Sequence, residues 1–146
     1  MKIKTLKQAQ KYLYSYRLAG MEQRATALEY NRCKYLARLL GNPQNKIKVI
    51  HIAGTSGKGS TSTMVSSLLH GQGKKVGLSI SPHLYDFRER VQINNELTDP
   101  KIFIKYLNEI SPALEKMKTS KYGPATFLEI MIIFAYYIFH KENVDY

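Results

Sequence analysis

The stretch HIAGTSGKGSTST, residues 51–63, places three glycines and a lysine in a run of small polar residues. A phosphate chain needs several backbone N–H donors that converge without side chains in the way, which is why glycines suit such a loop. We predict that this loop binds phosphate, with Lys58 reaching the outer oxygens and the following helix presenting its positive N-terminal end. The full pattern G-x-x-x-x-G-K-[ST] is not met, because Ile52 stands at its first glycine and Gly59 follows the lysine. An ordinary glycine-rich turn with a solvated lysine is the alternative.

The residues on either side of the loop predict a βαβ unit. The run IKVIHIA at 47–53 is rich in β-branched residues, as buried parallel strands are. A helical pattern follows over 59–70, and KKVGLSI at 74–80 indicates a second strand. Strands joined in this way lie parallel with a right-handed crossover, and ligands bind at the carboxyl edge of their sheet. We therefore expect an α/β fold with a mainly parallel sheet and the glycine loop at that edge.

Two helices and a hairpin are predicted outside this unit. Apolar residues at helical spacing indicate two amphipathic helices before Gly41, and the sequence GNP ends the second of them. The stretch ERVQINNELTD at 89–99 indicates a hairpin or an extended excursion, with Asn94 and Asn95 able to form its turn.

Two further helices are predicted in the second half of the chain. Asp99 before Pro100 is typical of a helix start, and Pro112 is expected to kink or divide that helix. The motif TFLE at 126–129 fits a capping box that opens the apolar run 127–139. That run contains a glutamate and is shorter than the roughly 20 residues of a membrane span, so we predict a buried helix.

Composition limits the classes of protein to which the chain can belong. Its 146 residues suffice for one domain with a core, and 44% hydrophobic and 23% charged residues are typical of globular chains. The formal charge of +11 favours anionic partners. The basic residues are spread along the chain without a zinc spacing or RNA-recognition signature, so we expect no nucleic-acid partner. The single cysteine, Cys33, excludes an internal disulfide, and the N-terminus has no apolar secretion signal, so we predict a cytoplasmic protein without a membrane partner.

Three longer stretches resemble one enzyme family in their order and spacing. They are LLGNPQNKIKVIHIAGTSGKGSTSTMVSSLL at 39–69, KKVGLSISPHLYDFRERVQIN at 74–94 and ATFLEIM at 125–131. The chain resembles folylpolyglutamate synthase and dihydrofolate synthase, of the Mur ligase superfamily, over about residues 12–146. The resemblance implies an incomplete three-layer P-loop fold like the central domain of a Mur ligase, with a mainly parallel sheet and two N-terminal helices.

The resemblance implies an ATP-dependent amide ligase with Mg²⁺ as a cofactor. ATP would phosphorylate a folate or dihydropteroate carboxylate, and the amine of L-glutamate would attack the acyl phosphate, with ADP and phosphate released. Lys58 would be the catalytic residue, because its charge stabilises the phosphoryl group in transfer. Ser56 replaces the asparagine that is usual in the family's loop. The residues expected to bind ATP are Gly54, Thr55, Ser56, Gly57, Lys58, Gly59, Ser60 and Thr61.

The same resemblance suggests the residues for the metal and the folate. Ser81, in the SPHL segment, would supply the metal contact that is missing after the lysine, and a plain turn at Ser81–Pro82 is the alternative. For the folate candidates, the alternatives are a solvated mixed-charge loop at 86–90, helix capping by Thr126 and a core position for Phe127. The folate-binding candidates are Pro82, His83, Arg88, Thr126 and Phe127.

The resemblance also predicts how much of such a ligase is present. We expect residues 1–146 to be an N-terminal part of the ATP-binding domain, with 1–45 as a helical lead-in and 46–146 as a P-loop core truncated before the next strand. An acidic metal ligand, a histidine, a modified lysine and the C-terminal domain of the family would lie beyond Tyr146. We therefore expect weak nucleotide binding, little or no ligation by these residues alone, and a missing C-terminal portion or a complementary chain as a partner.

Three other functions stay open on the sequence. Another Mur-type amide ligase is possible, although SPHL and FRERV resemble the folate branch. A P-loop switch or regulatory NTPase would bind or hydrolyse nucleotide without folate or glutamate. A non-catalytic nucleotide-binding fragment would bind a complementary chain instead.

Overall fold

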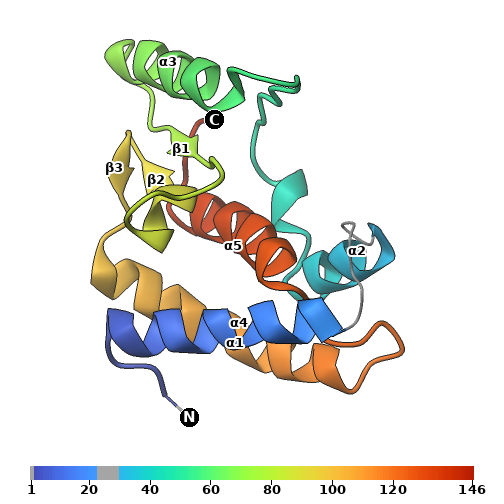
Figure 1. Ribbon diagram of the computed structural model, residues 1–146. Coiled ribbons are helices and arrows are strands. Elements are labelled where there is room, and N and C mark those ends of the chain that lie inside the picture. The colour runs from blue at the N-terminus through green and yellow to red at the C-terminus, as the bar shows by residue number, and fades with distance from the viewer. Residues whose placement is uncertain (1, 23–29) are drawn as a thin grey trace.

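The structure is a computed structural model, and it describes residues 2–22 and 30–146. Helices make up most of it, and a small sheet lies beside them (Figure 1). The helices are α1 (Leu6–Glu22), α2 (Tyr30–Leu39), α3 (Lys58–Gly71), α4 (Pro100–Lys118) and α5 (Phe127–Lys141), with the 3-10 turns η1 (Pro43–Asn45) and η2 (Phe87–Arg90). The strands are β1 (Gly77–Leu78), β2 (Gln92–Ile93) and β3 (Glu96–Leu97).

The hydrophobic core lies between α1, α2, α4 and α5. Helix α5 is at its centre, because its run of apolar side chains gives it more than one buried face. Phe134 of α5 meets Phe103 of α4 edge to face, with ring centroids 4.9 Å apart. Leu13 of α1 and Leu36 of α2 are also fully buried in this core. The buried helix predicted at 127–139 is thus confirmed, and no helix in the described part of the chain is long and apolar enough to cross a membrane.

The predicted starts of α4 and α5 are confirmed by their caps. The carboxylate of Asp99 accepts a hydrogen bond from the Lys101 N–H at 2.7 Å, which satisfies a donor that the first turn leaves open. Thr126 and Glu129 form the expected capping box at α5. Pro112 lies inside a continuous α4, so it does not divide the helix, and the alternative that it kinks the helix stays a prediction. Buried residues on both sides of it hold the helix against the core.

The hairpin predicted around Asn94 and Asn95 is also confirmed. Both asparagines have positive φ values, 54° and 63°, which a two-residue turn of this kind requires. Strand β2 pairs with β3 on one side and with β1 on the other, antiparallel in both cases. Gly77 of β1 needs to be glycine, because a Cβ there would lie 2.5 Å from the ring of Phe139.

The mainly parallel sheet is not shown in the described residues. Residues 47–53 form no strand, and only Gly77–Leu78 of the predicted run 74–80 is in one. A strand is defined by hydrogen bonds to a neighbour, and the backbone of 47–53 has no such bond to any described residue. The sequence predicted the residue type of a buried strand, but Val49 and Ile50 are each 50% exposed.

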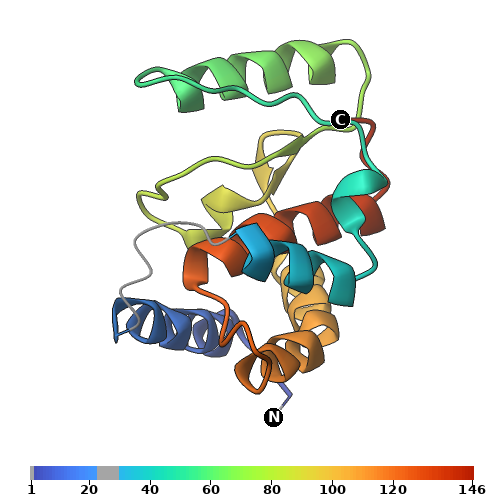
Figure 2. The same ribbon diagram turned by 90° about the vertical axis from the view of Figure 1, so that its right-hand side faces the viewer.

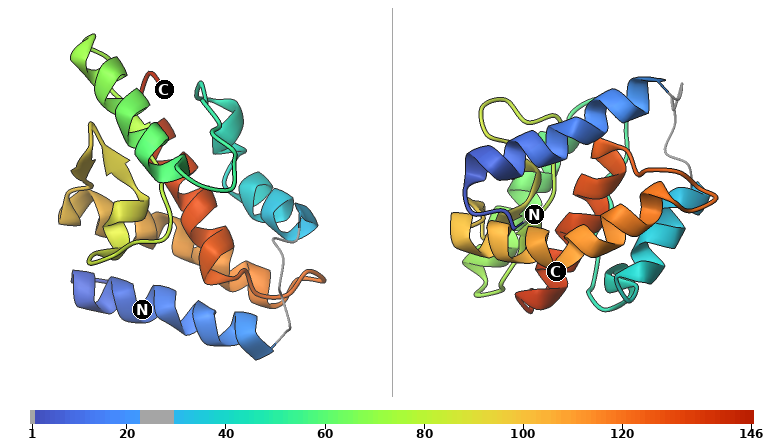
Figure 3. Two further views of the ribbon diagram at one scale, coloured as in Figure 1. Left: turned by 45° about the horizontal axis from the view of Figure 1, so that its top comes forward. Right: turned by 90° about the horizontal axis from the view of Figure 1, so that it is seen from below.

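Helix α3 lies apart from the helical core. Figure 2 shows it across the sheet region from α1 and α4, and in the left view of Figure 3 α5 lies between α3 and α1. Its one fully buried residue is Ser66. The amide of Asn95 donates to the Ser67 hydroxyl at 3.0 Å and links the hairpin turn to the helix. The glycine loop therefore enters a helix that has little apolar contact with the rest of the molecule.

Candidate functional site

The glycine loop leads directly into the N-terminus of α3. Gly57 is the residue before the helix and has φ 72°, in the left-handed region that favours glycine. A Cβ at this position would meet nothing within 4 Å, so backbone conformation and not space selects glycine here. The first backbone bond of the helix runs from the Thr61 N–H to the Gly57 carbonyl at 2.9 Å. The N–H groups of the first turn therefore point toward the exposed loop, as an anion-binding helix end requires.

Lys58 folds back over this loop. Its ammonium group donates to the Gly54 carbonyl at 2.7 Å and to the Thr55 carbonyl at 3.3 Å. The positive charge thus lies at the loop where a phosphate would bind. Phosphate binding would replace these two carbonyl acceptors with phosphate oxygens. All of the residues predicted to bind ATP lie in this loop and the first turn of α3, but their roles stay predictions.

The segment after Ser81 is held by its own acidic side chains. The Glu89 carboxylate accepts hydrogen bonds from the backbone N–H groups of Asp86, Leu84 and Tyr85, at 2.7, 2.7 and 2.8 Å. These three donors hold the pKa of Glu89 below its usual value. Asp86 caps η2 in turn by accepting from the Arg88 N–H at 2.9 Å. These hydrogen bonds hold the backbone of 84–89 in place.

Arg88 takes part in the same local structure. Its guanidinium donates to the Asp86 carboxylate, with the shortest contact at 2.6 Å, and to the Thr98 carbonyl at 3.1 Å. The side-chain hydrogen bond from Arg88 is the main cause that holds the pKa of Asp86 below its usual value. A folate carboxylate would have to compete with these acceptors, so the binding role predicted for Arg88 stays a prediction.

Two of the other folate candidates, His83 and Phe127, come together with two residues that the prediction left out. His83 Nε2 lies 3.1 Å from the Tyr14 hydroxyl, and Arg90 Nε donates to His83 Nδ1 at 2.8 Å. Because Nδ1 accepts, the proton of a neutral ring is on Nε2 and is donated to Tyr14. The Phe127 ring lies edge-on to Tyr14, with centroids 5.5 Å apart, and the Arg90 guanidinium lies over it at 5.4 Å. Tyr14 comes from α1, 69 residues before His83, so no local pattern could have placed it here.

A buried ion pair positions the start of α5 beside this cluster. Arg32 Nε of α2 donates to Glu129 Oε2 at 2.7 Å, and the side chains are 5% and 1% exposed. The same carboxylate oxygen accepts from the Thr126 N–H at 2.7 Å. Burial alone would raise the pKa of Glu129, but the hydrogen bonds from Arg32 and Thr126 outweigh it and lower the pKa. Thr126 therefore acts as a helix cap here, and Phe127 is largely buried, as the structural alternatives expected.

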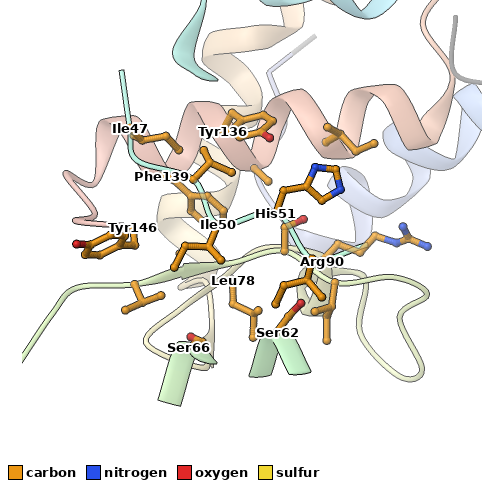
Figure 4. A pocket seen from close by; sticks show the side chains of 18 of the residues that line it. Ile47, Ile50, His51, Ser62, Ser66, Leu78, Arg90, Tyr136, Phe139 and Tyr146 are labelled. Atoms are coloured by element: carbon orange, nitrogen blue, oxygen red, sulfur yellow. The ribbon is translucent and has the colours of Figure 1, made fainter. Parts of the chain in front are cut away.

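A cavity of about 390 Å³ lies beside this region, between α3, α5 and two extended runs of chain (Figure 4). Its walls come mainly from 47–52 and 76–81, and Ser62 and Ser81 both line it. The run that follows β1 therefore ends at a cavity that α3 also lines, and the metal contact of Ser81 stays a prediction. The loop 54–57 does not line the cavity, so the cavity is not itself the phosphate site.

No known family model matches this chain. Over 116 residues it is 36% identical to the dihydrofolate synthase/folylpolyglutamate synthase of Bacillus subtilis, covering 79% of this chain and 27% of that enzyme. Its fold superimposes on the folylpolyglutamate synthetase from Lactobacillus casei with a TM-score of 0.84 and 28% identity, covering 97% of this chain and 35% of that one.

Sequence and fold both resemble those of the folylpolyglutamate synthases. A solved complex of a folylpolyglutamate synthase with AMPPCP and folate also matches, with a TM-score of 0.73 and 32% identity over 78% of this chain and 28% of that one. The resemblance inferred from the sequence is thus confirmed by two independent kinds of comparison. The chain spans about a third or less of the length of these relatives.

Proposed function

We propose that this chain forms the phosphate-binding part of an ATP-dependent ligase that joins L-glutamate to a folate or dihydropteroate carboxylate. The observation that carries the proposal is the glycine loop before α3 with Lys58 bent over it, in a chain similar to folylpolyglutamate synthases. The γ-phosphoryl group of ATP would pass to the carboxylate and leave ADP. The glutamate amine would then attack the acyl phosphate, forming the amide and releasing phosphate.

In this proposal the loop residues 54–61 bind the triphosphate through backbone N–H groups and hydroxyls. Lys58 exchanges its carbonyl acceptors for phosphate oxygens and neutralises the charge that develops during transfer. The folate-side candidates are the cluster of His83 and Phe127, with Pro82 and Thr126 beside them in sequence. Tyr14 and Arg90 join this list, because both contact His83 and Phe127.

Magnesium is proposed to accompany the nucleotide, but this chain supplies few ligands for it. No group of three or more His, Cys, Asp or Glu side chains in the described ranges could hold a metal. The Ser81 hydroxyl offers one oxygen, whereas Mg²⁺ takes six and favours carboxylates, phosphates and water. Phosphate oxygens of ATP and water would have to supply the other ligands of the ion.

We further propose that these 146 residues correspond to an N-terminal part of the ATP-binding domain, with a helical lead-in over 1–45. The chain spans only about a third or less of the length of its relatives. A second candidate function is therefore that these residues bind nucleotide but do not catalyse ligation on their own. ADP release in the presence of glutamate and dihydropteroate or a reduced folate separates the two. The cytoplasmic location stays a prediction from the sequence.

Binding of ATP by the Lys58→Ala variant tests the proposal most directly. Loss of a charge-assisted hydrogen bond of about 1.5–3 kcal/mol should weaken ATP binding roughly 10- to 150-fold in calorimetric titrations. Lys74→Ala is the matched control, because Lys74 is an exposed lysine beyond the other end of α3. If both variants bound ATP with the same affinity, the proposal that this loop binds the phosphates through Lys58 would be refuted.

A further inference from the structure

A row of lysines lies along the exposed side of α1. Lys7 and Lys11 are in the helix and Lys4 lies just before it, and all three side chains are exposed. Residues three and four apart share one face of a helix, about 5–6 Å from each other. Tyr14 follows Lys11 at the same spacing. The lysine stripe, as we call Lys4, Lys7 and Lys11, therefore leads along α1 to the cluster in which Tyr14 meets His83.

No carboxylate in the described part of the chain forms an ion pair with this stripe. Residues 2–11 contain four lysines and no acidic residue. Helix α4 packs beside α1 (Figure 1), and both of its glutamates have other partners. Glu115 accepts from the Tyr12 hydroxyl at 3.1 Å. Glu109 accepts from the Tyr137 hydroxyl at 2.8 Å. The positive charge of the stripe is therefore available to an anionic ligand.

The backbone at the start of the stripe is held in place. The Ile3 N–H donates to Asn108 Oδ1 of α4 at 2.9 Å, and Asn108 Nδ2 donates to the Ile3 carbonyl at 2.8 Å. The next N–H, that of Lys4, donates to Gln8 Oε1 at 2.7 Å. A row of charges on a fixed backbone lowers the cost of ordering that binding a flexible ligand would otherwise have.

The proposed reaction makes a ligand of the matching charge. Each amide bond uses one carboxylate of the substrate and brings in a glutamate with two, so the product has one more negative charge than the substrate. The product again has a free carboxylate, which a further round can phosphorylate. In every round the reacting carboxylate must reach the glycine loop, so the glutamyl units already present must lie elsewhere on the surface. A row of positive charges that ends at the folate-side cluster attracts them.

The surroundings of the stripe argue against a lipid surface as its ligand. A helix that binds a membrane directs an apolar face toward the lipid. The apolar side chains of α1, such as Ala9 and Leu13, are fully buried in the core instead. Gln8 and Ser15, which are exposed on the same helix, are polar. A soluble polyanion fits this surface better.

We propose that the lysine stripe of α1 binds the glutamyl carboxylates of folate substrates that already have more than one glutamate. The inference rests on the proposed function, because glutamate addition is the step that lengthens the tail. The stripe acts on substrate preference and not on the chemical step. Dihydropteroate has no glutamate, so its binding should not depend on these lysines.

Calorimetric titration of this chain with tetrahydrofolate that has one or three glutamates tests the proposal. The triglutamate should bind about 2- to 30-fold more tightly than the monoglutamate, which is the effect of two exposed ion pairs. The preference should disappear in about 0.5 M salt, because salt screens exposed charges. Equal affinity for the two folates, or binding of neither while ATP still binds, would overturn the proposal and leave the phosphate-binding loop standing.

Two double variants locate the tail. Lys7→Gln with Lys11→Gln should reduce the preference for the triglutamate to less than about twofold, and should change the binding of dihydropteroate and ATP by less than about twofold. Lys34→Gln with Lys74→Gln is the matched control, because it removes the same charge at two exposed lysines outside α1 and α4, and it should keep the preference. An equal loss in both double variants would show an effect of net charge alone and refute the assignment. Binding of phosphatidylserine vesicles through Lys7 and Lys11, without a preference for the triglutamate, would assign the stripe to a membrane and refute it as well.

Discussion

Replacement of Arg32 by methionine should destabilise the protein strongly at neutral pH. The side chains of Arg32 and Glu129 are 5% and 1% exposed, and the 2.7 Å bond between them joins α2 to the start of α5. Methionine has a similar volume but leaves the carboxylate buried beside an apolar side chain. Loss of one partner of a buried ion pair costs about 3–5 kcal/mol, a large fraction of the about 5–15 kcal/mol that stabilises a typical domain.

The loss should also depend on pH. In the unmutated chain the pKa of Glu129 is below its usual value, so its contribution to stability is present above the unfolded-state pKa and is lost as pH falls through the folded-state pKa. Without Arg32 the pKa of Glu129 rises, because burial is then opposed only by the remaining hydrogen bonds. Protonation relieves the buried charge, so the difference in unfolding free energy between the two proteins should shrink from pH 7 toward pH 4.

Urea denaturation followed by circular dichroism at pH 7 and pH 4.5 measures both effects. Lys34→Met is the matched control on the same helix, because Lys34 is exposed, and it should change the unfolding free energy by less than about 1 kcal/mol. A loss below about 1 kcal/mol for Arg32→Met at pH 7, or an equal loss at both pH values, would refute the reasoning.

Two further predictions concern single residues elsewhere. Burial, and then the nearby Glu129 carboxylate, raise the pKa of the Cys33 thiol to about 11. Because the thiolate is the reactive form, reaction of Cys33 with a disulfide reagent at pH 8 should be about 100-fold slower than that of a free thiol. The reaction should become fast in denaturant, which exposes the thiol. Gly77→Ala forces a methyl group against the ring of Phe139 and should cost about 1–3 kcal/mol in thermal unfolding. Gly71→Ala is its control, with no atom within 4 Å of the added carbon, and should be neutral or slightly stabilising; equal effects of the two would contradict the steric argument.

The capping box of Thr126 and Glu129 could be predicted from the sequence, whereas the ion pair of Glu129 with Arg32 could not. The pattern TFLE identified the bonds between Thr126 and Glu129, because these depend on residues three apart in one helix. The bond from Arg32 joins residues 97 apart, and nothing near Arg32 in sequence signals it. The same holds for Tyr14, which reaches His83 only after α1 has packed against the core. Contacts of this kind depend on how the helices pack.

The sequence by itself determined the local structure: the glycine loop and its helix, the hairpin turn at Asn94 and Asn95, and the starts of α4 and α5. Each of these depends on backbone preferences and hydrogen bonds within a few residues, so the local pattern suffices. The tertiary structure alone decided that 47–53, although it has the composition of a buried strand, forms none in the described chain. Pairing requires hydrogen-bonding groups on a neighbouring chain at the correct spacing, and no run of residues carries that information within itself.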